Sequence, residues 1–491
     1  MITFLIGLLI LIVGGMLYGR YCEKVFGPDD RDTPAVALGD GVDYVPMRNW
    51  RNSLIELLNI AGTGPIIGPI QGILFGPLAF ITIPIGNILA GSMHDYFSGM
   101  ISMRNNGAQM PRLIQKYLGN KTRGFYNIVI MILMLMVGAV FIYTPGDLIV
   151  TDLLGQKATA GNATTWIVYG GIFLYYLIAT LFPIDKIIGK VYPILGAILL
   201  ISAIGIFVGI LFNSSGLQNL DVTNIKVQNI SGSPWIPIFF ITVACGILSG
   251  FHATQATLIS RSVKSERHGR MTFFNMMLVE GFIAMCWAAG AMILFNGGID
   301  VKTPATLMIG NISREFLGGI GAYFAIAGVI VLPITSGDTA LRSLRLMIAE
   351  HFHIDQVKWS KRVMVSAAIF VPVIFILVWA KLQPAGFSLL WRYFAFTNQF
   401  IAIFALSMIT VYLSIHQKNR LISLIPGMFY TFVVMSFILH ASIGFNLDTL
   451  FGRADYMISY VVAGVITVLY AYLTLNYAKK HGMSIEDRKL V

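Results

Sequence analysis

The sequence predicts an all-α integral membrane protein with about thirteen transmembrane helices. Composition carries this prediction, because 56% of the 491 residues are hydrophobic and only 12% are charged, and the mean hydropathy is +0.76. A soluble chain holds about twice that share of charged residues. The net charge of +11 does not indicate a nucleic-acid partner, because the Lys and Arg residues stand in loops between apolar runs.

Each predicted span is a run of roughly 20 apolar residues, the length that crosses a bilayer as a helix. The first run is expected to stay in the mature protein, because it lacks the basic start and the A-x-A-like cleavage site of a signal peptide. The predicted ranges are 2–19, 52–74, 77–103, 125–150, 166–182, 191–212, 234–259, 272–295, 320–341, 363–380, 393–415, 421–440 and 456–477.

Loop charge predicts the orientation of these spans. Alternate loops hold Lys and Arg in a ratio of roughly four to one, and cytoplasmic loops carry the excess. We therefore expect the N-terminus outside and the tail at 479–491 in the cytoplasm. The cysteines, Cys22, Cys245 and Cys286, are expected to be small buried hydrophobes, since they suit neither a disulfide framework nor a zinc cluster.

Two predicted spans are interrupted by glycine, and the first also by proline. They contain IAGTGPIIGPI at residues 60–70 and ACGILSGFHATQ at residues 244–255. A break frees backbone N–H and C=O groups, and hydrocarbon offers no water to satisfy them. Interruptions at corresponding positions of two halves are typical of the midplane substrate site of a secondary transporter.

The spans between the first and the last two divide five plus five, with a broken helix opening each set. An odd number of spans forces the second copy to run inverted. TPGD at 144–147 and TSGD at 335–338 lie in the third helix of each set and support this repeat. The predicted organisation is an N-terminal helix and cytoplasmic loop, two inverted repeats, and two C-terminal helices with a short cytoplasmic tail, at 1–51, 52–215, 234–416 and 417–491.

Several motifs occur in order along this core: IAGTGPIIGP (60–69), LAGSMHDYFSGMISMRNNG (89–107), ACGILSGFHA (244–253), LPITSGDTALR (332–342) and FTNQFIA (396–402). They resemble the carbon starvation protein A family of bacterial and archaeal transporters, within the amino acid–polyamine–cation superfamily. The resemblance implies a cytoplasmic-membrane carrier for small peptides, or for pyruvate in some members, coupled to a cation gradient. The chain departs from the family in lacking the extended C-terminal region of its longest members. It also has His94 where members often show Gln before Asp95.

The predicted substrate-binding residues surround the two breaks. The half-helix after a break points N–H groups at the cavity, which suits a carboxylate, and the half before it points carbonyls, which suit a cation. Packing of small residues between helices is the alternative role for these glycines. The candidates are Gly62, Thr63, Gly64, Pro65, Gly246, Gly250, Phe251 and His252.

Two amides, Asn398 and Gln399, complete the predicted substrate site. They stand in a run of Phe, Ile and Ala, and an amide can meet both the donors and the acceptors of a peptide bond without burying a charge. Hydrogen bonding between helices is the alternative role for both.

Few ionisable residues lie within the spans, and such residues mark ion pathways, pairs or proton sites. The coupling candidates are Glu280, Asp95, Asp147 and Asp338. Glu280, within MMLVEGFIAM, is expected either to carry a proton or to cap a neighbouring broken helix by a hydrogen bond.

The neighbours His94 and Asp95 should point about 100° apart on a helix, so no metal site is expected there without other ligands. Asp95 is expected to pair with Arg104 or Arg342, and the spacing of Asp338 and Arg342 also allows an intrahelical pair.

Enzyme classes find no support, because GxxxxGK[ST], HExxH and GxSxG are absent from the sequence. Asp147 and Asp338 should lie toward opposite faces, which excludes an intramembrane aspartic dyad. A channel remains the rival class, since broken helices also line pores. A sensor is disfavoured because no sizeable soluble domain is present. The expected partners are a peptide or pyruvate, a coupling cation (H⁺ before Na⁺) and the bilayer, with no cofactor, metal or nucleic acid.

Overall fold

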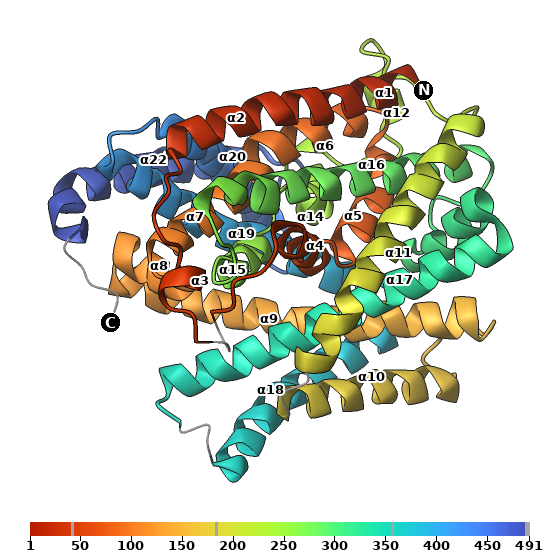
Figure 1. Ribbon diagram of the computed structural model, residues 1–491. Helices are drawn as coiled ribbons and strands as arrows, with labels where there is room; N and C mark the ends of the chain where they lie inside the picture. The colour runs from red at the N-terminus through yellow and green to blue at the C-terminus, as the bar shows by residue number, and fades with distance from the viewer. Residues whose placement is uncertain (41–43, 182–184, 355–357, 487–491) are drawn as a thin grey trace.

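The computed structural model of the chain describes residues 1–40, 44–181, 185–354 and 358–486. These residues form helices and no strand, with one isolated bridge between Met47 and Val263. Many helices run side by side, and the N-terminus and the last described helix, in blue, lie at opposite ends of the bundle (Figure 1). The all-α class is thus confirmed. Residue 182, where one predicted span ends, and residues 487–491 of the predicted tail lie outside the described residues.

Ten described helices are long and apolar enough to cross a membrane, and one bent pair brings the number to 11. Helical segments also occupy the two remaining predicted ranges, at 79–104 and 235–259, but with interruptions. The structure therefore supports a multi-pass membrane protein, while the count of about thirteen spans stays a prediction.

The first half of the chain ends with the long helix α11. Short η elements are single 3₁₀ or π-helical turns that continue a neighbouring helix. In chain order the elements are α1 (Ile2–Leu9), η1 (Ile10–Gly14), α2 (Gly15–Phe26), α3 (Pro34–Ala37), α4 (Asn49–Ile60), α5 (Gly64–Gly72), η2 (Ile73–Phe75), α6 (Ala79–Gly86), η3 (Asn87–Ser92), α7 (Met93–Arg104), α8 (Met110–Leu118), α9 (Asn120–Leu148), η4 (Ile149–Leu153), α10 (Ala163–Leu181) and α11 (Asp185–Phe212).

The second half begins with the second broken segment and ends with a helical hairpin. Its elements are α12 (Ile225–Gln228), η5 (Trp235–Phe239), α13 (Phe240–Thr242), α14 (Ala244–Ile247), α15 (Gly250–Ile259), η6 (Glu266–His268), η7 (Arg270–Phe274), α16 (Asn275–Asn296), α17 (Ala305–His351), α18 (Trp359–Leu382), α19 (Gly386–Ile415), α20 (Leu421–His440), α21 (Leu447–Leu450) and α22 (Met457–Glu486).

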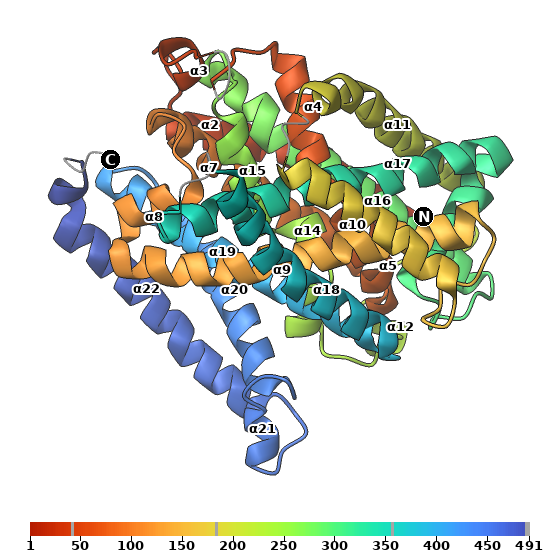
Figure 2. The ribbon, with the colours of Figure 1, turned by 90° about the horizontal axis from the view of Figure 1, so that it is seen from below.

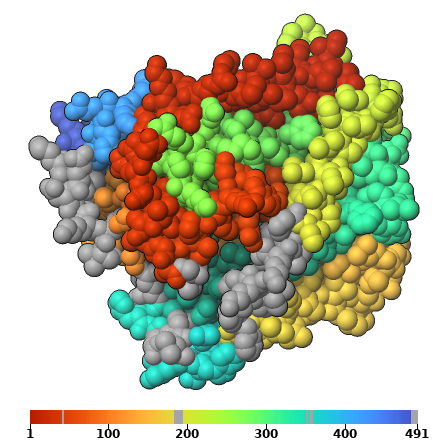
Figure 3. All heavy atoms as spheres, viewed as in Figure 1, coloured from red at the N-terminus to blue at the C-terminus, as the bar shows by residue number. Residues whose placement is uncertain are grey.

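The N-terminal helix, α1 to α2, lies along one face of the molecule, where it appears in red beside the green middle of the chain (Figure 3). It stops at Gly27, whose φ of 69° is left-handed and easily adopted without a side chain. At the opposite end of the sequence, α20 and α22 form a hairpin joined by α21 (Figure 2). Asp448 caps α22 there by accepting hydrogen bonds from the N–H groups of Ile458 (2.8 Å) and Ser459 (3.2 Å).

The two predicted breaks are present and touch each other. α4 and the α5–η2 helix meet at 51° across Ala61 to Thr63, and Pro65 fits the first turn of α5 because a proline there forfeits no helical hydrogen bond. The second break is an extended stretch at Leu248 and Ser249 between α14 and α15. The segments approach so closely that a Cβ on Gly68 would stand 2.9 Å from the carbonyl oxygen of Thr242.

We expect Gly250→Ala to destabilise the protein, because the new Cβ would lie 2.6 Å from both the carbonyl oxygen of Asn398 and the amide nitrogen of Ala402. Backbone atoms cannot swing aside, so α15 must move off α19 at a cost of about 1–3 kcal/mol. Thermal unfolding in detergent measures the loss. Gly171→Ala is the matched control, since a Cβ there meets nothing within 4 Å, and equal unfolding temperatures for the two variants would contradict the expectation.

Candidate functional site

A small cavity lies where the two breaks meet. Its volume is ≈ 10 Å³, room for about one water molecule, so in this conformation it holds no substrate-sized space. Five predicted substrate residues line it: Gly62, Gly64, Phe251, His252 and Asn398. The remaining wall is formed by Asn59, Ile60, Val137, Phe141, Cys245, Ser249 and Phe394.

The other predicted substrate residues lie outside this lining, namely Thr63, Pro65, Gly246, Gly250 and Gln399. Gly250 is pressed against α19, as described above, and the carbonyl of Gly246 accepts a hydrogen bond from the Asn87 amide (3.2 Å). Gln399 donates to the carbonyl of Phe240 at 2.7 Å. For Gly246, Gly250 and Gln399 the structure thus shows packing and interhelical hydrogen bonds, the alternative roles.

Asn398 serves the second break directly. Its Oδ1 accepts hydrogen bonds from the Ser249 hydroxyl (2.9 Å) and from the backbone N–H of Phe251 (3.3 Å). It therefore satisfies one of the N–H groups that the break leaves free at the start of α15. Asn398 therefore both caps α15 and lines the cavity.

Beside the cavity, three helices bring together buried titratable side chains. His252 on α15 lies between Asp95 on α7 and Glu280 on α16, with Nδ1 3.3 Å from Asp95 Oδ2 and Nε2 3.7 Å from Glu280 Oε1. Neither contact has hydrogen-bond geometry, and both oxygens of Glu280 lack a hydrogen-bond partner. His94 Nδ1 contacts the other oxygen of Asp95 at 2.7 Å. Glu280, His252, Asp95 and His94 thus form, in this order, a buried row of titratable side chains.

The side-chain tips of His94 and Asp95 contact each other, although successive residues on a helix are directed about 100° apart. The expected pairing of Asp95 with an arginine is wrong. Asp95 pairs with histidines, whereas Arg104 pairs with Glu266 (2.9 Å) and Arg342 donates to the carbonyl of Ala179 (3.0 Å). Glu280 caps no broken helix, since its oxygens accept no hydrogen bond.

The remaining coupling candidates, Asp147 and Asp338, lie outside this cluster and accept hydrogen bonds from other side chains. Asp147 accepts hydrogen bonds on Oδ1 from the hydroxyl of Tyr169 (2.5 Å) and the ammonium of Lys381 (2.7 Å). Asp338 accepts one from the hydroxyl of Tyr175 at 2.8 Å. Sequence reasoning missed Lys381 because it follows the predicted end of a span, yet α18 extends past it and buries it. A lysine on the last turn of an apolar helix was the available signal.

The buried carboxyl of Glu56 was likewise not predicted as a site residue. Glu56 on α4 is fully buried, and neither of its oxygens has a hydrogen-bond partner. Among the described residues, no group of three or more His, Cys, Asp or Glu side chains is arranged to hold a metal ion.

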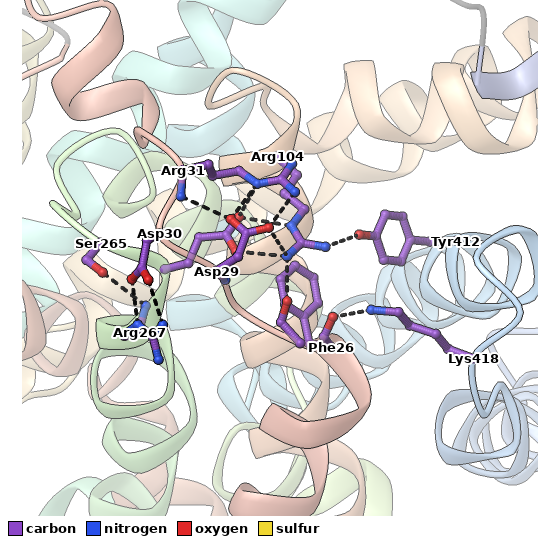
Figure 4. Close-up of polar contacts among 11 residues, drawn as sticks. Phe26, Asp29, Asp30, Arg31, Arg104, Ser265, Arg267, Tyr412 and Lys418 are labelled. Carbon is purple, nitrogen blue, oxygen red and sulfur yellow. Dashed lines mark hydrogen bonds and ion pairs between the residues drawn. The ribbon is translucent and has the colours of Figure 1, made fainter.

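An ion-pair network around Arg104, the Arg104 network, joins the end of α2 to distant parts of the chain. The buried carboxylate of Glu266 accepts two hydrogen bonds from Arg104 (2.9 Å each) and one from the N–H of Asp29 (3.1 Å). Arg104 also donates to the carbonyl of Gly27 and lies 4.1 Å from the ring centre of Phe26 (Figure 4). The N-terminal helix is thereby fastened to α7 and η6.

Outlying pairs extend the Arg104 network. Arg267 forms two hydrogen bonds with Asp30 (2.7 and 2.8 Å), and Arg31 forms two with Asp29 (2.7 and 2.6 Å). These bonds lower the pKa of Asp30 and of Asp29, so both carboxylates stay charged at neutral pH. Any stability they contribute is present above their unfolded-state pKa and is lost only as the pH falls through the lowered values. The network is therefore no switch in the neutral range.

Comparison with known proteins places this arrangement in a family. The family model described as "Carbon starvation protein CstA" matches residues 1–168, 142–316 and 305–438. An uncharacterized membrane protein of Haemophilus influenzae is 40% identical over 340 residues, which cover 60% of this chain and 92% of that protein.

Relatives with functional names are more distant. The peptide transporter CstA of Escherichia coli strain K12 is 23% identical over 549 residues, covering 85% of this chain and 77% of that protein. The pyruvate/proton symporter BtsT of the same strain is 26% identical over 348 residues, covering 59% of this chain and 48% of that protein.

Among solved structures, a manganese transporter of Eremococcus coleocola superposes with a TM-score of 0.53 at 13% identity, covering 92% of this chain and 99% of that one. At this identity the likeness shows the fold alone. The family match, in contrast, runs through most of the chain and includes the segments that hold both breaks. It confirms the resemblance seen in the sequence motifs: the chain belongs to the carbon starvation protein CstA family.

Proposed function

We propose that this protein is a secondary active transporter that imports small peptides across the cytoplasmic membrane of a bacterium or archaeon, driven by protons. One observation carries the proposal: residues of both helix breaks bound a single cavity, and the buried Glu280–His252–Asp95 cluster lies against it. A substrate at the breaks and a proton on the cluster would share His252, which is how binding of one can depend on the other.

The proposal includes the inverted repeat, with segments at 52–215 and 234–416 and about thirteen spans in all. The broken helices α4–α5 and α14–α15 would open the two repeats, and their contact would form the substrate site. Packing between α9 and α17, the third helices of the two repeats, is consistent with this arrangement.

The side on which the protein is open to solvent supports an outward-facing conformation. A vestibule of ≈ 870 Å³ opens on the side that carries Lys157 and Lys302, which loop charge assigns to the exterior. On the other side, which loop charge assigns to the cytoplasm, the Arg104 network holds α2, α7 and η6 together. This orientation places the N-terminus outside and the C-terminus in the cytoplasm.

We expect Glu266→Gln to open the cytoplasmic side, because an amide cannot pair with Arg104 as a carboxylate does. The loss of charge-assisted hydrogen bonds should shift the equilibrium toward inward-open states by roughly tenfold. Labelling of Ser260→Cys from the cytoplasmic side, in a background without the native cysteines, measures that opening, since Ser260 is buried in the closed state.

Asp30→Asn is the control for Glu266→Gln. Its pair with Arg267 is exposed, with side-chain exposures of 62% and 78%, so its loss should change labelling little. Equal labelling rates in the two variants would mean that Glu266 does not hold this side closed.

The second candidate is import of pyruvate or another small carboxylate, which the relative named pyruvate/proton symporter favours. Peptide import is preferred because the relatives named for peptides align over more of this chain. The volume of the vestibule also lies within the range of sites for larger ligands.

Uptake into proteoliposomes tests the proposal. Labelled tripeptide and labelled pyruvate are offered in parallel under an imposed pH gradient, an imposed sodium gradient, or neither. Accumulation of peptide above the external concentration, driven by the pH gradient alone, is the expected result. Pyruvate accumulation without peptide uptake would select the second candidate, and equilibration without accumulation would indicate a channel.

A further inference from the structure

The outer vestibule offers charged groups of both signs, although the proposed substrate site lies deeper. Its floor is aromatic: Tyr143 on α9 stacks on Phe387 of α19 with ring centres 4.5 Å apart. Trp391, also in its wall, lies 5.4 Å from Phe394, which lines the small cavity at the breaks. The aromatic rings of Trp391 and Phe394 therefore connect the lining of the vestibule with that of the small cavity.

Asp147 presents an unused acceptor to the vestibule. Its Oδ1 is occupied by Tyr169 and Lys381, but Oδ2 accepts no hydrogen bond, and the side chain remains 10% exposed. Asp147 is one of the residues that line the vestibule. An ionised carboxylate only accepts hydrogen bonds, so a ligand group at this oxygen must be a donor such as an ammonium.

Two donors on α19 also belong to the lining of this vestibule. Trp391 is 2% exposed, and its indole Nε1 has no hydrogen-bond partner. Arg392, next to it, is exposed, and the described residues provide it with no ion pair. An indole N–H and a guanidinium together suit a carboxylate.

The separation of Asp147 and Trp391 along the helix axes follows from the register of α9 and α19. α9 and α19 run antiparallel, because Phe125 contacts Phe404 while Tyr143 contacts Phe387. Asp147 lies one turn beyond Tyr143, and Trp391 lies one turn beyond Phe387 in the opposite direction, so the two are roughly 11 Å apart along the axes. An extended chain covers about 3.3–3.6 Å per residue, which makes this the span of about three residues.

We propose that the vestibule is an entry subsite for the charged ends of a short peptide. Asp147 Oδ2 binds the amino-terminal ammonium, and Trp391 Nε1–H with Arg392 binds the carboxylate. The carboxylate end of the peptide is then the end nearer to the helix breaks. This inference rests on peptide import as the proposed function and names its substrate class: zwitterionic peptides of about three residues.

Charge balance explains why a peptide suits this subsite better than pyruvate. Asp147 and Lys381 already form a neutral buried pair, and a zwitterion adds no net charge beside it. A lone carboxylate would draw the cationic groups and leave Asp147 less compensated, and an uncompensated buried charge is costly.

Uptake of a tripeptide, its N-acetyl derivative and its C-terminal amide by the wild-type protein is the first measurement. Blocking either end should raise KM about tenfold or more, because each loses a charge-assisted hydrogen bond. If no peptide is taken up, the proposed function fails. If blocked and free peptides share one KM, peptide import stands and the subsite is excluded.

Variants assign each end to its residue. Asp147→Asn should abolish the discrimination against the N-acetyl peptide and keep that against the amide, whereas Trp391→Phe with Arg392→Gln should do the reverse. Wild-type discrimination in either set overturns the assignment of that end. Should Asp147→Asn fail to fold, the Trp391→Phe and Arg392→Gln set decides, because it keeps the aromatic ring and the Asp147–Lys381 pair.

Discussion

Gly62→Val should abolish uptake while the protein remains folded in the membrane. Gly62 lines the cavity between the breaks, and a Cβ there would stand 3.5 Å from the Phe141 ring, an ordinary contact. The branched side chain would therefore enter the cavity instead of forcing helices apart. Because the cavity holds only ≈ 10 Å³ before it opens, the added methyl groups would occupy the space on which substrate binding depends.

Uptake in proteoliposomes and thermal unfolding in detergent should be measured together. Gly171→Val, on the exposed face of α10, makes the same change where a Cβ meets nothing, and it should keep wild-type uptake. Gly64→Val is unsuitable as a second test, because its Cβ would overlap Cys245 and the fold would be disturbed. Uptake by folded Gly62→Val at the wild-type rate would place the substrate elsewhere.

The breaks and much of the cavity could be predicted because their cause is local. Glycine and proline at residues 60–70 interrupt a helix wherever it packs, and Gly62, Gly64, Phe251 and His252 follow from the position of the interruption. The same local pattern could not tell which glycines face the cavity. Gly250 faces a neighbouring helix instead, and only the packed structure shows this.

Contacts between side chains on distant segments could not be predicted from the sequence. Asp95, His252 and Glu280 stand on separate helices, and nothing in their spacing indicates that they meet. A pairing of Asp95 with arginine was the natural electrostatic expectation, but Arg104 is the last residue of α7 and pairs with Glu266 there. Glu266 was not predicted as a partner, because it lies in a loop whose charged residues were used only to predict topology.

The cluster next to the cavity leads to a second prediction of large effect. Glu280→Gln should abolish accumulation driven by a pH gradient and preserve exchange of labelled for unlabelled substrate. The amide has nearly the shape of the carboxyl but cannot take up or release a proton at physiological pH. Because Glu280 makes no hydrogen bond in the protein, the change also breaks no structural contact of that kind.

Counterflow and gradient-driven uptake, measured on the same proteoliposomes, separate coupling from binding. His252→Gln should share the loss of accumulation, since His252 lies between Glu280 and Asp95, at 3.7 and 3.3 Å. Glu315→Gln is the matched control, because that carboxylate is exposed and its replacement should leave accumulation unchanged. If Glu280→Gln still accumulates substrate with the wild-type dependence on pH, Glu280 does not carry the coupling proton. The histidine–aspartate pair on α7 and α15 would then be the remaining route for the proton through this part of the protein.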